Sequence, residues 1–324
     1  MTERTDLKTI AAEWLADGKA DVLIGWQAGT LPLAAAPLIL HADRSGADPA
    51  GGNKDKLVFD ARCAMNLVNL LHKFKDKKVA VVVKGCDSRS LIGLIQEKQV
   101  DRDRIVVIGA PCAGVIDPSA LARITGCDAP SGATLEKDQV RVVCDREEKV
   151  VPLSEAVYPG CRGCSVRNPL LADCLIADPV EQSAAPEAFG DVEALRQMSR
   201  DERWRKFLHE MKRCILCHAC RAMCPACYCR ECFADITRPR LAGRTADPAD
   251  AMFFHLLRLM HLAGRCTGCG ACVRACPMGV DLRLYNDFLR AFAKKEYGFE
   301  AGADAQAPPF IGEFDQNDPN DFTM

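Results

Sequence analysis

The chain has 324 residues, of which 48% are hydrophobic and 27% charged, and its formal net charge is -2. This composition excludes a largely disordered protein, and the length favours two domains. The near-neutral charge predicts no nucleic-acid partner, and the lack of a long apolar segment or a secretory leader predicts a cytoplasmic chain with no transmembrane segment.

Residues 1–180 alternate short apolar runs with helical segments. This pattern is typical of an α/β domain with a mostly parallel sheet, because strands buried on both faces are continuously apolar. The predicted strands are Asp21–Trp26, Leu38–His41, Leu57–Asp60, Val79–Lys84, Ile105–Ile108 and Val140–Cys144, and the predicted helices are Ala64–Phe74, Ser88–Glu97 and Pro118–Ile124.

Two predicted strands of this domain are each followed by a glycine and a cysteine, Cys86 and Cys112. In open α/β sheets ligands bind beyond the carboxyl ends of strands, and a cysteine near a helix N-terminus is biased toward the thiolate form. With the C-x-x-C pair Cys161 and Cys164, these residues predict a third iron–sulfur cluster, with Cys63 in reserve as a ligand. Buried thiols are the expected state of three further cysteines, Cys127, Cys144 and Cys174.

The second half of the chain is predicted to be mainly helical. We expect a linker at 181–195, a helical domain at 196–300 and a flexible tail at 301–324, which could also lie as a strap over a partner. Helical periodicity is visible in Leu195–Met211, in Ala251–Ala263 and in residues 280–295.

One cysteine pattern occurs twice in this half: C-x-x-C-x-x-C-x-x-x-C-P, beginning at residues 214 and 266. In two-cluster ferredoxins the first three cysteines of each copy bind one [4Fe–4S] cluster and the fourth binds the other. The pattern therefore predicts a first cluster on Cys214, Cys217, Cys220 and Cys276, and a second on Cys266, Cys269, Cys272 and Cys224.

Alternatives to this ligand set remain at the level of sequence. Zinc held by four cysteines also uses C-x-x-C pairs, but a third close cysteine and a following proline in both copies favour iron–sulfur clusters. Nineteen cysteines without a leader indicate a reducing compartment rather than a disulfide scaffold. Three further thiols, Cys227, Cys229 and Cys232, are candidate extra ligands or buried thiols beside a cluster.

Polar residues around the two motifs have a plainer expectation. His218 lies between two ligands and could donate a hydrogen bond to cluster sulfur, although exposure to solvent is the simpler expectation. The basic residues Lys212, Arg213, Arg265 and Arg274 are expected on a solvated surface, where they could offset cluster charge or contact a partner.

The residues of the first half resemble the β-subunit family of coenzyme F420-reducing hydrogenases and formate dehydrogenases. The resemblance covers roughly residues 20–180 and is carried by LVFDARCAMNL (57–67), by the KGCDSR to GAPC segment (81–115), and by CRGC and ADCLIAD (161–178). It implies an iron–sulfur α/β module that often carries FAD and exchanges electrons with F420. Gly25, Gly29 and Thr30 are the candidate flavin contacts, although such a glycine turn is also often only a turn.

The second half resembles the α-helical ferredoxins, which include the heterodisulfide reductase C subunit. Together the two resemblances imply a non-catalytic electron-transfer subunit of an anaerobic oxidoreductase complex, with a hydrogenase, formate dehydrogenase or heterodisulfide reductase-like flavoprotein as partner. One alternative is a flavin-containing enzyme that acts directly on F420 or a nicotinamide cofactor. Another is a zinc-bound structural scaffold.

Overall fold

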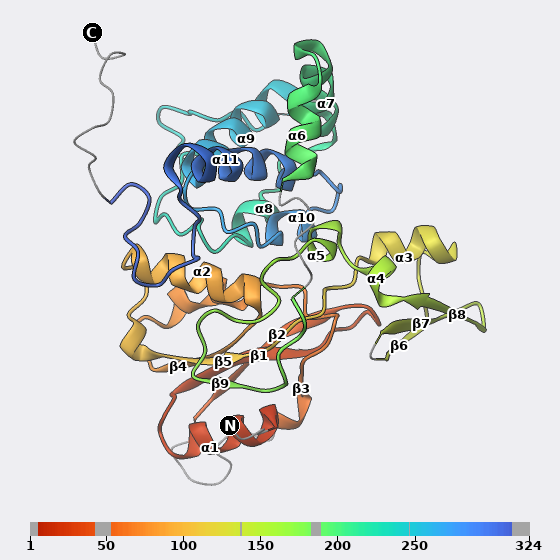
Figure 1. The fold of residues 1–324 in the computed structure, drawn as a ribbon, viewed down its shortest axis with the longest axis vertical. Coiled ribbons are helices and arrows are strands. Elements are labelled where there is room, and N and C mark those ends of the chain that lie inside the picture. Colours follow the sequence, from red (N-terminus) through yellow and green to blue (C-terminus); the bar gives the residue numbers. More distant parts are fainter. Residues whose placement is uncertain (1–5, 43–52, 137, 183–188, 246, 313–324) are drawn as a thin grey trace.

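A computed structural model describes residues 6–42, 53–136, 138–182, 189–245 and 247–312. A sheet-containing part formed by the first half of the chain lies below a group of helices formed by the second half, and α2 lies between them (Figure 1). None of the helices in these ranges is long and apolar enough to cross a membrane.

The main sheet has the strand order β2-β1-β4-β5-β9, with β3 paired to the side of β1. The pairs β1–β4, β4–β5 and β5–β9 are parallel, whereas β2 and β3 run antiparallel to β1. The predicted mostly parallel sheet is therefore confirmed. Its strands are β1 (Val22–Ala28), β2 (Ala35–His41), β3 (Leu57–Val58), β4 (Val79–Val83), β5 (Ile105–Gly109) and β9 (Cys174–Leu175).

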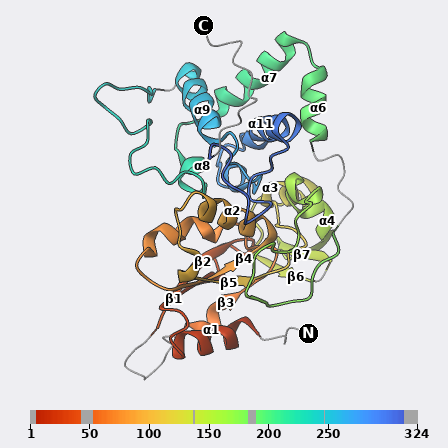
Figure 2. The same ribbon diagram turned by 60° about the vertical axis from the view of Figure 1, so that its left-hand side comes forward.

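Both faces of this sheet are covered, which explains its apolar central strands. Every residue of β4 is buried. The helix α1 (Leu7–Ala16) lies on one face, and α2 (Gly85–Gln96) lies on the other, on the side of the C-terminal helices (Figure 2). Because β4 and β5 are adjacent and parallel, their carboxyl ends, followed by Cys86 and Cys112, lie at the same edge of the sheet.

The predicted strand Val140–Cys144 belongs to a separate antiparallel sheet, so its assignment to the parallel sheet was wrong. The strands β6 (Gly132–Leu135), β7 (Gln139–Cys144) and β8 (Glu147–Pro152) pair in that order, with α3 (Pro118–Thr125) beside them. A two-residue turn joins β7 to β8, and both of its residues, Asp145 and Arg146, have positive φ. Such turns favour local hairpin pairing over a crossover.

Cys127 and Cys144 form a disulfide that ties this small sheet to the segment after α3. The expectation of two buried thiols was therefore wrong. The spacing of 17 residues gave no sign of the pairing, which depends on how the small sheet folds back.

Other boundaries differ from the sequence prediction. The helix expected at Ala64–Phe74 is a 3-10 helix at Leu67–Phe74, and the strand expected at Leu57–Asp60 ends at Val58. The helix expected at Leu195–Met211 is two helices, because Ser199 forms a capping box with Glu202 that starts a new one. The C-terminal helices are α6 (Gly190–Gln197), α7 (Arg200–Arg213), α8 (Ala219–Ala222), α9 (Pro248–Leu262), α10 (Ala271–Arg274) and α11 (Leu282–Tyr297).

The segment 301–312 packs against the chain itself, so the expectation of a flexible tail was wrong for these residues. The carbonyl oxygen of Ala301 accepts hydrogen bonds from the buried Arg89 of α2, and Gln96 donates to the carbonyl of Asp304. The segment thus fastens α11 to α2. Residues 313–324 of the predicted tail, and 183–188 of the predicted linker, lie outside the described residues, and α6 begins within the range predicted for that linker.

Candidate iron–sulfur sites

The four cysteines predicted to bind the first cluster line one cavity. Cys214 directly follows α7, and Cys276 follows α10. Cys217 lies just before α8, and Cys220 lies within it. Cys214 and Cys276, which are 62 positions apart in the sequence, therefore line the same cavity. This is the arrangement in which the fourth cysteine of one motif joins the first three of the other. Backbone N–H groups of Leu216 and Val280 approach the sulfurs of Cys214 and Cys276, each at 3.4 Å.

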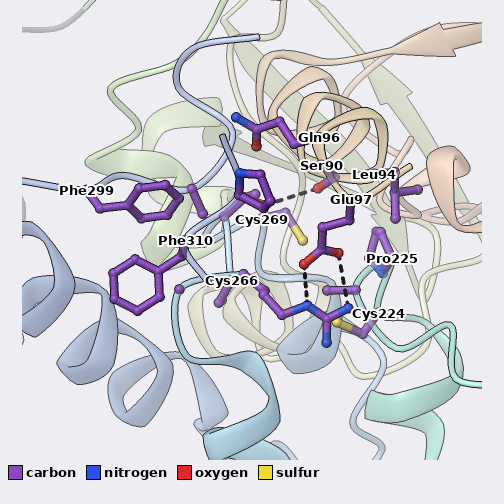
Figure 3. A pocket seen from close by; sticks show the side chains of 17 residues that line it. Ser90, Leu94, Gln96, Glu97, Cys224, Pro225, Cys266, Cys269, Phe299 and Phe310 are labelled. Atoms are coloured by element: carbon purple, nitrogen blue, oxygen red, sulfur yellow. Dashed lines mark hydrogen bonds and ion pairs between the residues drawn. The ribbon is translucent and has the colours of Figure 1, made fainter. Parts of the chain in front are cut away.

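A second cavity is lined by three of the four cysteines predicted for the second cluster, Cys224, Cys266 and Cys269 (Figure 3). The fourth, Cys272, is buried within electrostatic range of the other three. The opposite wall comes from α2, where Glu97 is paired with Arg265 at 2.6 Å. This cavity therefore lies at the contact between the two parts of the chain.

The two cysteine motifs adopt the same backbone conformation. In the second motif the residues two and four positions after the first cysteine are Gly268 and Gly270, and both have positive φ. In the first motif the equivalent residues, Leu216 and His218, also have positive φ. This conformation costs a non-glycine residue about 1–3 kcal/mol, so two equivalent loops shaped around equivalent groups explain why it is retained.

The third predicted set of cysteines also gathers around one cavity. Cys86 lies in the first turn of α2, Cys112 follows β5, Cys161 lies in α5 (Pro159–Arg162) and Cys164 follows it. The backbone N–H of Cys112 donates to the carbonyl of Arg167 at 3.0 Å, which holds the C-x-x-C segment against the end of the sheet. Strand ends and a distant C-x-x-C pair therefore meet at one cavity, and their role as cluster ligands stays a prediction.

Burial controls the protonation of these thiols. It raises the pKa of Cys112 to about 11 and that of Cys86 well above its usual range. The expected thiolate bias at a helix N-terminus is therefore outweighed by desolvation. A metal would have to displace the protons, and burial then favours ligation because a bound thiolate shares its charge with iron.

The candidate donors line cavities and do not converge on single points. In the ranges that the structure describes, no three side chains of the His, Cys, Asp and Glu types converge closely enough to hold one metal ion. Four thiolates on one zinc lie within about 4 Å of each other. The four irons of a cubane each bind one thiolate, which suits cysteines distributed around a cavity.

Other candidate residues are not brought to these cavities. Cys63 lies in the apolar core of the sheet, where burial raises its pKa to about 12, and it lines none of the three cysteine cavities. Gly25 packs against Leu57 within β1. Gly29 closes the β1–β2 turn through a hydrogen bond to Ala34, and Thr30 is exposed beside it.

The three extra thiols are separated from one another. Cys227 lies beside Cys224, Cys232 packs with Phe233 in the core of the helical part, and Cys229 is exposed. These three residues form no metal site among the described residues. Their role as extra ligands stays a prediction.

Three basic side chains lie among the cysteines; sequence reasoning assigned no role to two of them, His255 and Arg258, and expected the third, Arg274, on a solvated surface. His255, which is 2% exposed, places Nε2 at 3.3 Å from the sulfur of Cys214. Arg258 is 3% exposed and donates to the carbonyl of Cys220. Arg274, expected on the surface, donates to the carbonyl of Cys269 at 2.7 Å. The visible signal was a pair of basic residues on the apolar face of one helix.

His218 is also placed differently from the simpler expectation. Its ring contacts Phe254 edge-on at a centroid distance of 4.6 Å, and its Nδ1 is buried with no hydrogen-bond partner among the described residues. Packing against an aromatic ring, rather than solvent exposure, therefore fixes this histidine within the first motif.

Comparison with known proteins agrees with this geometry. Residues 210–280 match the family model of a 4Fe-4S dicluster domain. The chain is 24% identical to the β subunit of the F420-dependent formate dehydrogenase of Methanocaldococcus jannaschii, with 80% of this chain and 84% of that subunit covered. It is 25% identical to the β subunit of F420-dependent formate dehydrogenase 1 of Methanococcus maripaludis, with 74% and 76% covered.

A structural neighbour was also found. A chain of the F420-reducing [NiFe] hydrogenase complex of Methanosarcina barkeri, solved in a xenon derivatization study, matches with a TM-score of 0.38 and 18% identity. The match covers 51% of this chain and 60% of that one. The predicted resemblance to the formate dehydrogenase β subunits is thus confirmed, and the dicluster domain supports the two predicted [4Fe–4S] clusters.

Proposed function

We propose that this chain is an electron-transfer subunit of an oxidoreductase complex, in which single electrons pass through three [4Fe–4S] sites. The observation that carries the proposal is the adjacency of the cysteine cavities. Cys269 lines both the cavity of the second motif and the cavity that holds Cys86, Cys112, Cys161 and Cys164. A thiolate-bound cluster changes its charge by one electron with little movement of its ligands, so adjacent sites form a conduction path.

The arrangement supports one order of sites along this path. The cavity of the sheet domain adjoins the second-motif site through Cys269. The second-motif and first-motif sites are joined by one short stretch of chain, because Cys220 belongs to one and Cys224 to the other. Electrons would pass between the sheet domain and the first motif by way of the second.

The first-motif site is the proposed point of exchange with a partner subunit. Cys217 is exposed, and Ile215, two residues before it, is 61% exposed. Little of the chain therefore covers this end of the site. The named relatives are β subunits of formate dehydrogenases, which supports a formate dehydrogenase catalytic subunit as the partner. A hydrogenase or a heterodisulfide reductase-like flavoprotein is the alternative partner that the sequence resemblances imply. An anaerobic, cytoplasmic setting is part of the same proposal.

A second candidate function is direct reaction with F420, with FAD as the intermediate carrier. It is supported by the F420 dependence in the names of both relatives, rather than by Gly25, Gly29 or Thr30, whose positions have other structural explanations. Flavin analysis of the purified protein separates the two candidates, because only the second requires bound FAD.

The test is the metal content of the whole chain purified without oxygen. We expect about twelve irons and as many sulfides per chain, by four irons for each cubane, and EPR signals that develop on reduction. A preparation that contains zinc in place of iron and accepts no electrons would overturn the proposal. About eight irons would confine the clusters to residues 210–280 and remove the third site.

A cysteine variant tests the third site separately. Cys112→Ala should lower the iron content by about four atoms per chain and leave the signals of the other two clusters unchanged. Cys174→Ala is the matched control, because Cys174 lies on the neighbouring strand β9 but does not line the cavity. Equal iron loss in both variants would show general unfolding rather than loss of a ligand.

A further inference from the structure

Two arginines, the buried Arg258 and the partly buried Arg274, lie at the two junctions between the cysteine sites. Arg258 is within electrostatic range of Cys220 from the first site and of Cys224 and Cys272 from the second. Arg274 is within range of Cys269 from the second site and of Cys86 and Cys161 from the third. Each guanidinium thus faces two of the three sites.

Both side chains donate to backbone carbonyls, and Arg258 also hydrogen-bonds to the side chain of Cys227. Arg258 donates to the carbonyl of Cys220 at 3.2 Å. Arg274 donates to the carbonyl of Ala64 at 2.8 Å and to that of Cys269 at 2.7 Å. One nitrogen of each guanidinium, Nε of Arg258 and Nη2 of Arg274, is buried and has no hydrogen-bond partner among the described residues.

Neither arginine has a carboxylate partner within the part of the chain that the structure describes. Other arginines near the same cysteines are paired: Arg89 with Glu300, Arg265 with Glu97 and Arg290 with Asp287. The carboxylate that acts on Arg274 from a distance is Asp87, which is bound to Lys84 at 2.7 Å.

A buried cation without a counter-ion is strongly destabilising. Arg258 is 3% exposed, and the sulfurs of Cys224 and Cys272 are among the charged or polarisable groups that surround it. The negative charge that compensates these two arginines must therefore come from the surrounding cysteines, which are those of the three sites and, for Arg258, also Cys227. Four thiolates on a cubane supply it, and the supply increases when the cluster gains an electron.

We propose that Arg258 and Arg274 are the counter-charges of the iron–sulfur sites, and that each raises the reduction potentials of the two sites it separates. This inference rests on the proposed function, since it requires clusters at those sites. Arg274 acts on the third and second sites, and Arg258 acts on the second and first. Because each cation favours the reduced form on both sides, it also lessens the repulsion between neighbouring reduced clusters. Both residues act through their charge and bind no iron themselves.

The test compares reduction of each cluster by EPR at controlled potential in Arg274→Gln, Arg258→Gln and the charge-preserving Arg274→Lys and Arg258→Lys. In Arg274→Gln the ratio of reduced to oxidised cluster at a fixed potential should fall about tenfold at the second and third sites, which is ~59 mV for one electron. The first site should be unchanged. Arg258→Gln should affect the first and second sites and spare the third. Signals are assigned by the loss of one of them in Cys112→Ala.

The control is Lys206→Gln, which makes the same charge change on the exposed surface of α7 and should shift no potential, because solvent screens it. If Arg274→Gln retains its iron and all ratios stay within twofold of the wild type, the inference is wrong. If the glutamine variant loses iron, retention by Arg274→Lys supports a role of charge, and loss in both variants overturns it in favour of packing. Absence of iron in the wild type would instead refute the proposed function.

Discussion

Replacing His255 should lower the potential of the first-motif cluster alone. Burial, assisted by the charge of Arg258, lowers the pKa of His255 to about 4, so the ring is neutral near pH 7. With Nε2 3.3 Å from the Cys214 sulfur, the neutral ring donates to a thiolate through Nε2–H. In that tautomer Nδ1 carries no proton and cannot donate a hydrogen bond, which agrees with the absence of a partner for Nδ1 among the described residues.

The size of the effect follows from the energy of such a bond. A hydrogen bond to a charged group contributes about 1.5–3 kcal/mol. Reduction places more negative charge on the sulfur, so we take about half of that energy, near 1 kcal/mol, as the part that depends on the added electron. For a one-electron couple this corresponds to a lower potential by about 40 mV.

The assay is EPR of the first-motif cluster at controlled potential. His255→Phe removes the donor at similar size and should show the full decrease, whereas His255→Gln retains a donor and should recover part of it. His261→Phe is the control, because His261 is exposed on the same helix and contacts Phe233 instead of a cysteine. An unchanged potential in His255→Phe, or equal shifts of all clusters, would refute the assignment of this hydrogen bond.

Two further predictions concern how the sheet domain is held. Gly85→Ala should cost about 1–3 kcal/mol by overpacking and lower the iron content by about four atoms, because a Cβ would lie 2.0 Å from the carbonyl oxygen of Val166. Gly93→Ala in the same helix meets open space and should raise the free energy of unfolding by up to about 1 kcal/mol, a difference that thermal melting and iron analysis detect. Glu97→Gln removes the partly buried pair with Arg265 and should weaken the contact between domains by about 1 kcal/mol. Faster amide exchange in α2 and around the second motif would be the sign, and unchanged exchange there would contradict it.

Several features of the site could be predicted because they depend on local spacing. The repeated motif predicted a dicluster domain in the second half, and the strand-end cysteines, with the C-x-x-C pair, line one cavity. Cys63 was misplaced because its strand ends at Val58, so the chain turns and buries the thiol in the apolar core. The strand Val140–Cys144 was misplaced because a hairpin pairs β7 with β6 and β8 instead of the main sheet.

The sequence by itself determined the chemistry of this protein, since ligand type and spacing along the chain specify which cysteines can surround a cluster. Only the tertiary structure decided the electrostatics. The sequence does not show which groups surround His255, Arg258 and Arg274, and their importance comes from their positions between segments that are far apart in the chain. The effect of a charge depends on its distance from other charges and on the exclusion of water, and both are properties of the folded chain.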